Sequence, residues 1–320
     1  MTHSLAIIIP VFNEADAIAP FRDAMVPVLQ QARTRFGLEI RLVFVDDGSS
    51  DGTAQVIAET DWPVAVQLLS LSRNFGKEAA MTAGLAHAPD DAVVVMDVDL
   101  QDPPELIIEM VRLWTEGAKV VLARRNDRSS DGFRKRVTAQ WFYRLHNRIS
   151  NIDIPYYVGD FRLMDRAVVA AVNQLPENRR FMKGLFAWVG FAPVFLDYKR
   201  PVRQAGKTKF SGWKLWRFAV EGITGFSEVP LVIWTYMGAL IALVSFLYAG
   251  FIVLRTLVFG VDVPGYASLI TIMLFLGGIQ VLGIGVLGEY LGRVYSEVKR
   301  RPPYIIAETQ ELPARKSDAG

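Results

Sequence analysis

Two long stretches without a charged side chain constrain this chain more than any other feature. They cover residues 229–254 and 263–288 of a 320-residue sequence. About 20 consecutive apolar residues are enough for a helix to span the hydrocarbon layer of a bilayer. Both stretches are apolar on every side rather than on one face, which disfavours helices packed on a soluble domain. The sequence therefore predicts two transmembrane helices within residues 229–291.

Positive charge is distributed unequally around these stretches. Their connection, residues 255–262, has Arg255 as its only basic residue, whereas the outer flanks are rich in Lys and Arg. Residues 199–228 combine basic side chains with tryptophans and a helical row of apolar residues, as in helices that lie in the plane of a membrane surface. Because positive charge stays inside the cell, we expect a cytosolic domain of residues 1–198 at the cytoplasmic membrane. Residues 292–320 are then a cytosolic tail, disordered after Pro303.

The beginning of the chain alternates apolar strands with helical patterns. Strands are expected at residues 5–9, 40–45, 64–71, 93–96 and 119–123. Runs of apolar β-branched residues are typical of strands buried on both faces. The first helix contains Pro20 and Pro27, so we expect it to start late or to kink. The alternation predicts an α/β fold with a doubly wound, mostly parallel sheet. Neither a Gly-x-Gly-x-x-Gly motif after the first strand nor a Walker loop is present, which disfavours the folds that carry them.

Cysteine and histidine usage limits the chemistry. The chain has no cysteine and three histidines. Disulfides, thiolate metal sites and a cysteine nucleophile are thereby excluded. None of the histidines lies at metal-ligand spacing from another, which disfavours a zinc enzyme.

Two aspartates end the fourth expected strand. Asp97 and Asp99 follow its buried run and precede Pro103 and Pro104, which suit the first turn of a helix. Open α/β sheets bind their ligands at the carboxyl ends of strands, and carboxylates suit Mg²⁺ or Mn²⁺. Side chains alternate along a strand, so the chain must turn here for both carboxylates to reach one ion. The alternative is that the two acids only close the strand and cap the helix.

Two basic runs and a second acidic position complete the pattern. Basic and aromatic residues are interleaved at residues 124–148, and a second run covers residues 199–217. Such runs are usually solvated faces or nucleic-acid patches, but two membrane spans beside the second disfavour nucleic acid. Between them, Asp160 and Arg162 lie among apolar neighbours, where a carboxylate needs a partner to be tolerated.

Five short motifs in series resemble those of the polyprenyl-phosphate glycosyltransferases of glycosyltransferase family 2. They are residues 10–14 (PVFNE), 46–51 (DDGSSD), 97–104 (DVDLQDPP), 159–162 (GDFR) and 206–211 (GKTKFS). The similarity extends over about residues 5–306 and is strongest to the bactoprenol glucosyltransferase branch. It implies a GT-A catalytic domain, then interfacial helices and two transmembrane helices. The activity it implies is transfer of glucose, with inversion, from UDP-glucose to undecaprenyl phosphate.

The resemblance also assigns roles to single residues. It places the donor nucleotide at Pro10, Phe12, Glu14, Asp47 and Asp97. It places a Mg²⁺ or Mn²⁺ ion at Asp97, Asp99 and Gln101. It makes Asp160 the catalytic base, with Asp99 as the second catalytic carboxylate. It gives donor or acceptor phosphate to Arg124, to Arg134 or Arg136, to Arg203 and to Lys209.

Several alternatives stay open at this point. A lipid phosphate is largely ionised at neutral pH, because its second pKa lies near 6, so Asp160 has little proton to remove and instead positions the acceptor or Arg162. The branch favours glucose, while mannose, galactose, an N-acetylated sugar and an amino-deoxyarabinose stay open as alternatives. A processive polysaccharide synthase is disfavoured, because its Gln-x-x-Arg-Trp motif is absent. An inactive membrane scaffold is the non-enzyme alternative. Expected partners are further copies of the chain, up to a homotetramer, and a flippase.

Overall fold

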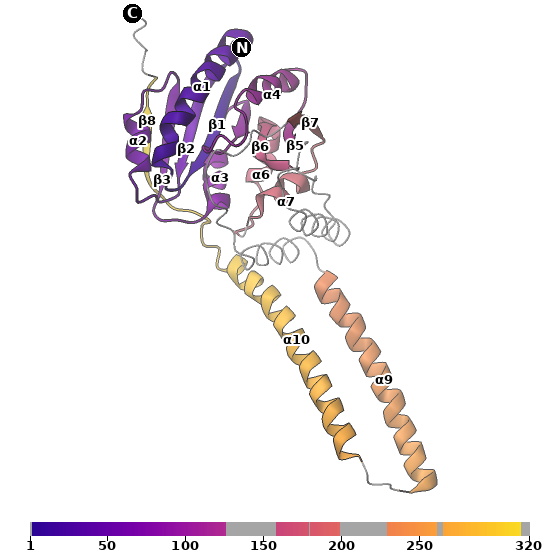
Figure 1. Ribbon diagram of the computed structural model, residues 1–320. Coiled ribbons are helices and arrows are strands. Elements are labelled where there is room, and N and C mark those ends of the chain that lie inside the picture. Colours follow the sequence, from indigo (N-terminus) through magenta and orange to yellow (C-terminus); the bar gives the residue numbers. More distant parts are fainter. Residues whose placement is uncertain (1, 126–157, 179, 199–228, 261–264, 315–320) are drawn as a thin grey trace, which may run out of the picture.

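A mixed sheet forms the centre of the molecule. The computed structural model describes residues 2–125, 158–178, 180–198, 229–260 and 265–314. Within these ranges the sheet has eight strands in the order β7-β5-β6-β4-β1-β2-β3-β8. The strands are β1 (Ser4–Val11), β2 (Glu39–Asp46), β3 (Ala65–Leu71), β4 (Ala92–Val95), β5 (Val120–Arg125), β6 (Val158–Asp165), β7 (Pro193–Tyr198) and β8 (Ile306–Leu312). Figure 1 shows that two long helices project from the domain built on this sheet.

The central strands β3, β2, β1 and β4 are parallel. Every side chain of residues 5–9 in β1 is fully buried, because helices cover both faces of the sheet, as the unbroken apolar run predicts. Each of the five predicted strands overlaps an observed one. The outer pairings make the sheet mixed, since β6 is antiparallel to both β4 and β5, and β8 is antiparallel to β3. The predicted doubly wound α/β fold is confirmed.

Two helical layers bury separate cores. On one face, α1, α2 and α4 pack against residues such as Ile7 and Ile9 of β1. On the other face, α3, α6 and α7 pack against Ala6 and Ile8. The helices are α1 (Ala15–Phe36), α2 (Thr53–Glu59), α3 (Lys77–Ala86), α4 (Leu106–Thr115), α6 (Arg166–Asn173) and α7 (Met182–Trp188). Alternate residues of one strand thus supply both cores.

The first helix corrects one expectation. Helix α1 begins at Ala15 and runs through Pro20 and Pro27, so the predicted late start is wrong. Both prolines are exposed, and the carbonyls they leave without an N–H partner belong to Asp16 and Asp23, which are exposed as well. Water can satisfy those carbonyls. Burial of the apolar face of α1 then stabilises the helix by more than the missing hydrogen bonds destabilise it.

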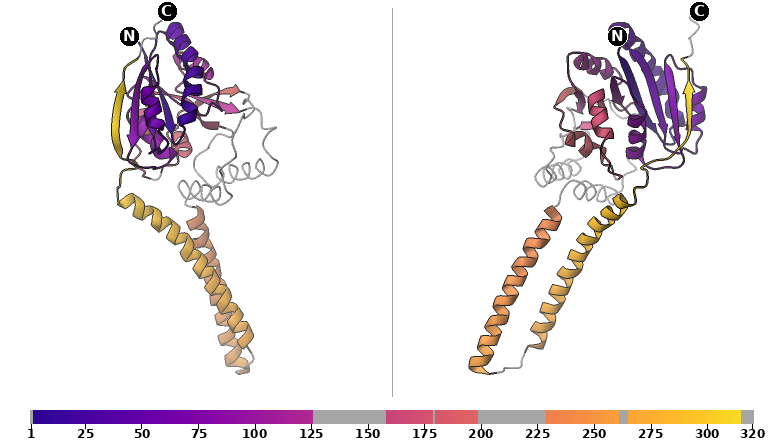
Figure 2. Two further views of the ribbon diagram at one scale, coloured as in Figure 1. Left: turned by 60° about the vertical axis from the view of Figure 1, so that its left-hand side comes forward. Right: turned by 180° about the vertical axis from the view of Figure 1, so that it is seen from behind.

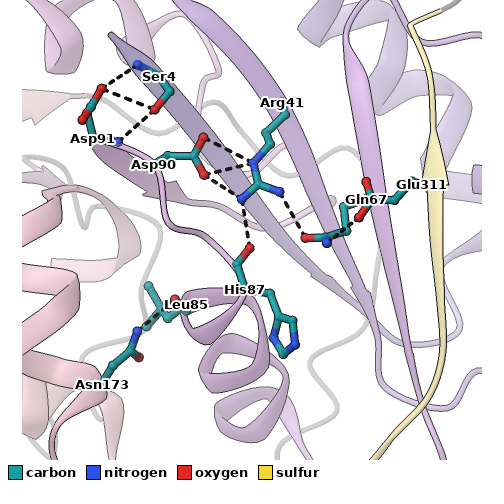
Figure 3. Close-up of polar contacts among 9 residues, drawn as sticks. All are labelled: Ser4, Arg41, Gln67, Leu85, His87, Asp90, Asp91, Asn173 and Glu311. Carbon is teal, nitrogen blue, oxygen red and sulfur yellow. Dashed lines mark hydrogen bonds and ion pairs between the residues drawn. The ribbon is translucent and has the colours of Figure 1, made fainter.

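The chain after the long helices corrects a second expectation. Residues 306–312 form β8, an ordered strand paired with β3, so the disorder predicted after Pro303 is wrong for the described residues up to 314. Without β8, strand β3 would be an open edge of unpaired backbone groups. Side chains add to the pairing, as Figure 3 shows: Gln67 donates to Glu311 at 2.6 Å and accepts from Arg41 at 3.2 Å. Arg41 in turn forms an ion pair with buried Asp90 at 2.7 Å.

Helices α9 (Val229–Phe259) and α10 (Tyr266–Val298) form the projecting pair in Figures 1 and 2. By length and composition, two segments are apolar enough to cross a membrane, Leu231–Phe259 with a mean hydropathy of 2.4 and Phe275–Val298 with 1.4. Gly283 faces Trp234 of α9, whose ring would lie 3.4 Å from an added Cβ. Helix α10 continues past residue 291, the predicted end of the second span. The expected interfacial helices at 199–228 lie outside the described residues.

Candidate functional site

The carboxyl ends of β2, β1 and β4 meet at one edge of the sheet. Met96 extends the pairing of β4 by donating to Ile8 at 3.1 Å, and Asp47 extends that of β2 by donating to Val11 at 2.9 Å. The start of β8 lies at the same edge, because Ser72 donates its N–H to Ile305 at 2.9 Å. Ile305 follows shortly after the end of α10, so this edge of the sheet is the one on the side of the long helices (Figure 1).

The chain turns immediately after Asp99, as the sequence requires for two carboxylates to share a ligand. Leu100 has a φ of +53°, an uncommon conformation for a residue with a side chain. The turn lets Gln101 donate its N–H to Asp99 at 3.1 Å, and the Gln101 amide also donates to the Asp99 carboxylate. Asp99 is exposed and Asp97 is partly buried. The strand end therefore presents the Asp99 carboxylate openly to solvent and the Asp97 carboxylate only in part.

Asp97 and Asp160 face each other across two antiparallel strands. Val95 of β4 pairs with Arg162 of β6, and two residues further toward the site along each chain come Asp97 and Asp160. Like charges directly opposite each other on paired strands are destabilising. Lys77 of α3 offsets this repulsion, because its Nζ lies 2.7 Å from a carboxylate oxygen of each aspartate. The predicted partner of Asp160 is thus an ammonium group.

Lys77, Asp97 and Asp160 form an ion cluster, the Lys77 cluster. Charges in and beside this cluster shift the pKa values of several groups. Burial opposes ionisation of Asp160, but Lys77, Lys183 and Arg162 outweigh it and lower the pKa of Asp160 to about 2. Burial and the charge of Asp160 raise the pKa of Glu78 to about 7. Burial lowers the pKa of Arg162 to about 10, against the attraction of Asp160 and Glu78. Asp160 is therefore ionised at every physiological pH, whereas Glu78 titrates near neutrality.

Asp47 fixes the loop that leads into α3. Its two carboxylate oxygens accept from the N–H groups of Phe75 at 2.7 Å and Gly76 at 2.8 Å. The next residue, Gly48, packs so closely on this loop that an added Cβ would lie 2.5 Å from the carbonyl carbon of Arg73. Asp47 is buried. The residue that the resemblance assigns to the donor nucleotide thus also holds the segment preceding Lys77.

The loops after β1 and β2 are joined by several hydrogen bonds. The N–H of Asn13 donates to Ser49 at 2.9 Å, and the N–H of Ser50 donates to the Asn13 side chain at 2.8 Å. The N–H groups of Glu14 and Ala15 donate to Thr53 at 3.0 Å and to Asp51 at 3.2 Å. Pro10 near the end of β1 is partly buried and Val11 is buried, whereas the next residue, Phe12, is 42% exposed. These loops place an open aromatic face and the Glu14 carboxylate at the same edge as Asp97.

Arg124 is the described member of the predicted phosphate-binding set. It makes a two-pronged ion pair with Asp197 of β7, at 2.6 and 3.0 Å, and lies over the Phe195 ring. Among the described residues, Arg124 thus contacts β7 and does not contact the Lys77 cluster. Arg134, Arg136, Arg203 and Lys209 lie outside the described residues.

The donor set fits a divalent ion whose shell is completed by substrate. In the part of the chain that the structure describes, no group of three or more His, Cys, Asp or Glu side chains gathers as a metal site. Asp97, Asp99 and the Gln101 amide oxygen supply hard oxygen ligands near one turn. Mg²⁺ is commonly held by one or two carboxylates together with substrate phosphates, and this set suits that arrangement.

A cavity of about 270 Å³ adjoins the cluster on the side of the long helices. It is lined by residues of the α3 start, including Lys77 and Glu78, and by Arg180, Phe181 and Pro303. One guanidinium nitrogen of Arg180 is buried and has no hydrogen-bond partner among the described residues. The site therefore extends from the acidic edge toward the end of α10.

Sequence reasoning missed Lys77 and Glu78. One signal was available, because a lysine in the first turn of a helix opposes the helix dipole and so indicates another task. The distance along the chain hid that task, since the partners of Lys77 lie 20 and 83 residues away.

Comparison with known proteins finds one matching family and several close relatives. The family described as Glycosyl transferase family 2 matches residues 6–172. A prophage bactoprenol glucosyl transferase homolog of Escherichia coli K12 is 50% identical over 310 residues, which is 96% of this chain and 99% of the relative. The bactoprenol glucosyl transferase of Shigella phage SfV is 51% identical over 310 residues, again 96% of this chain and 99% of the relative. A solved glucosyl-3-phosphoglycerate synthase of Mycobacterium tuberculosis, in complex with Mn²⁺, UDP-glucose and phosphoglyceric acid, is 19% identical at a TM-score of 0.44, covering 69% of this chain and 78% of that one.

Proposed function

The chain belongs to glycosyl transferase family 2, and on that premise we propose that it transfers glucose from UDP-glucose to undecaprenyl phosphate at the cytosolic face of a membrane. The observation that carries the proposal is the similarity to bactoprenol glucosyl transferases along nearly the whole of both chains. It covers the two apolar helices as well as the catalytic domain, so it extends to the part that would meet a lipid acceptor.

The donor would occupy the loops at the carboxyl ends of β1, β2 and β4. The exposed ring of Phe12 offers a surface for uracil, with Pro10 beside it, and the Glu14 carboxylate can accept from ribose hydroxyls. Asp47 supports this pocket indirectly, because it fixes the loop at Phe75 and Gly76. Asp97, Asp99 and Gln101 would hold Mg²⁺ or Mn²⁺, which neutralises the charge of the departing diphosphate when it is bound.

The transfer would be a single displacement with inversion at the anomeric carbon. The nucleophile is an oxygen of the lipid phosphate, which is largely ionised near neutral pH. Asp160, with a pKa of about 2, is a weak base and takes up almost no proton at that pH. Its role is then to hold the acceptor side of the site in place together with Arg162.

The acceptor would reach this site from the bilayer. We assign residues 1–198 to a cytosolic catalytic domain, 199–228 to interfacial helices, 229–291 to two transmembrane helices and 292–320 to a cytosolic segment. The lipid phosphate would be gripped by arginine and lysine side chains, which suit phosphate geometry and charge. They are Arg124, Arg134 or Arg136, Arg203 and Lys209. A homo-oligomer and a flippase that moves the product across the membrane complete the proposal.

One experiment tests the proposal directly. Membranes containing the chain are incubated with a panel of radiolabelled nucleotide-sugars, undecaprenyl phosphate and Mg²⁺ or Mn²⁺, and the lipids are extracted. We expect label in the lipid fraction from UDP-glucose, and its loss in Asp99→Ala. Undiminished glycolipid from Asp99→Ala would contradict the proposed metal site, and no labelled lipid from any donor would contradict the activity.

A further inference from the structure

Lys77 occupies a position that helix energetics disfavours. It is the first residue of α3, where the partial positive charge of the helix end repels an ammonium group. Its side chain is still 42% exposed, so it is not needed to fill a core. A charged group held in such a place requires compensation from elsewhere, and the two aspartates provide it.

Contacts that do not involve the Lys77 side chain hold the backbone that leads into Lys77. Asp47 binds the N–H groups of the two preceding residues, at 2.7 and 2.8 Å. The loop also rests against Gly48, which leaves no space for a Cβ. Asp47, at the end of β2, therefore fixes the position of the α3 start. The Lys77 ammonium then lies between Asp97, which follows β4, and Asp160 of β6.

At that point the ammonium joins two halves of the site. One contact goes to Asp97, where both carboxylate oxygens lie within 2.9 Å of Nζ, and the other goes to Asp160 at 2.7 Å. Asp97 belongs to the turn that carries the candidate metal ligands, and Asp160 belongs to β6. Without the ammonium, two carboxylates would face each other across the strand pair and repel.

We propose that Lys77 is a positioning residue that ties the donor side of the site, at Asp97, to the acceptor side, at Asp160, and competes with a divalent cation for Asp97. This inference rests on the proposed function. It predicts two effects of opposite sign when the ammonium is lost. Turnover falls because the two carboxylates are no longer held in place, and cation binding becomes tighter because Asp97 is free for a cation. A purely structural lysine would weaken turnover and cation binding together.

The absence of cysteine from the chain allows a specific test in the full-length protein. Lys77→Cys removes the ammonium, and alkylation with 2-bromoethylamine then restores an amine on a side chain as long as lysine. We expect Lys77→Cys to lower kcat about 10- to 100-fold, the effect of a misplaced reacting group, with a smaller change in KM for the nucleotide-sugar. Alkylation should recover most of the lost kcat.

Binding of Mn²⁺, followed by electron paramagnetic resonance without any sugar donor, gives the second readout. We expect roughly tenfold tighter binding in Lys77→Cys, because removal of a neighbouring positive charge favours a cation, and a return toward the original affinity after alkylation. Lys77→Met, which lacks the ammonium and cannot be alkylated, should bind Mn²⁺ as Lys77→Cys does. Its kcat should stay low after the same treatment.

The matched control is Lys119→Cys. Lys119 also pairs with an aspartate, Asp165 at 3.1 Å, but makes no contact with the cluster, so neither kcat nor Mn²⁺ affinity should change. Unchanged or weaker Mn²⁺ binding in Lys77→Cys, or no recovery of kcat after alkylation, would overturn the inference. Because the Mn²⁺ measurement needs no transfer reaction, it still decides the role of Lys77 if the proposed activity fails.

Discussion

At the scale of single residues, Asp160 separates two mechanisms. The positive charges around it lower its pKa to about 2, below the ordinary value of 3.8. A carboxyl with a lowered pKa is ionised above that pKa and gains a proton only as the pH falls through it. Across pH 5–9 the charge of Asp160 is therefore constant, and the residue imposes no acidic limb on the rate.

We predict that Asp160→Asn lowers kcat about tenfold, by an amount that is the same at every pH, because a positioning charge is lost rather than a base. The acidic limb that the lipid phosphate imposes near pH 6 should persist in the variant. Steady-state rates of glycolipid formation between pH 5 and 9 check this. A drop of about a hundredfold or more, with disappearance of that limb, would make Asp160 the base.

Gly48 shows how one missing side chain supports the site. It has a φ of +72°, and an added Cβ would meet backbone atoms of Arg73 and Asn74 at 2.5 and 2.7 Å. We predict that Gly48→Ala lowers stability by about 2–4 kcal/mol and reduces turnover, because the loop before Lys77 must move. Gly52 is the matched control, since its φ is +86° but nothing lies within 4 Å of its Cβ position.

Gly52→Ala should then cost only about 1–2 kcal/mol of backbone strain and leave turnover nearly unchanged. Thermal unfolding in detergent and the transfer assay distinguish the two variants. Equal losses in both would mean that the close approach of Gly48 to the loop is unimportant.

At the scale of elements, sequence reasoning found what is locally encoded. The strands β1 to β4 were predictable because residues such as Ile7 and Val94 come in runs that only a doubly covered sheet can bury. Strand β6 was missed, because Asp160 and Arg162 interrupt its apolar pattern, and their pairing with Lys77 is not visible along the chain. Strand β8 was missed because its side chains are mostly polar, while its pairing with β3 is made mainly by backbone hydrogen bonds.

The catalytic candidates divide in the same way. Asp97, Asp99 and Asp160 were found from motifs, whereas the contact that joins two of them depends on the geometry of α3. Arg124 was found as a basic residue, but its pairing with Asp197 depends on β7 lying beside β5. Strand ends are readable from sequence, and contacts between distant elements are not.

Strand β8 should contribute measurably to the stability of the domain. We predict that truncation before residue 306 lowers the free energy of unfolding by about 1–3 kcal/mol, because β3 loses its ladder and the Gln67–Glu311 hydrogen bond. Truncation before residue 315 keeps β8 and is the matched control. Thermal unfolding in detergent measures both, and equal melting temperatures would contradict a stabilising role for β8.

At the scale of the whole molecule, α10 connects to the catalytic domain in two ways. Its last turn is fixed by Glu297, which accepts from the N–H of Asn178 at 3.0 Å. The chain then continues through Pro303, at the cavity beside Lys77, into β8. The apolar helices are therefore attached on the side where the strands end in acidic residues. This places the proposed acceptor source and the reaction site at the same end of the domain.

This attachment changes how removal of the helices must be tested. A chain that ends at residue 228 loses α9 and α10 but also β8, so lower activity could reflect instability alone. A second variant, in which a flexible glycine and serine linker replaces residues 229–300, keeps β8 on β3. We predict that both variants bind UDP, that the second melts at the higher temperature, and that neither transfers sugar to a long-chain lipid phosphate. Isothermal titration with UDP, thermal unfolding and the lipid assay check the three parts. Full transfer to the long-chain acceptor by the linker variant would show that the helices do not deliver the substrate, because the catalytic edge alone would then suffice.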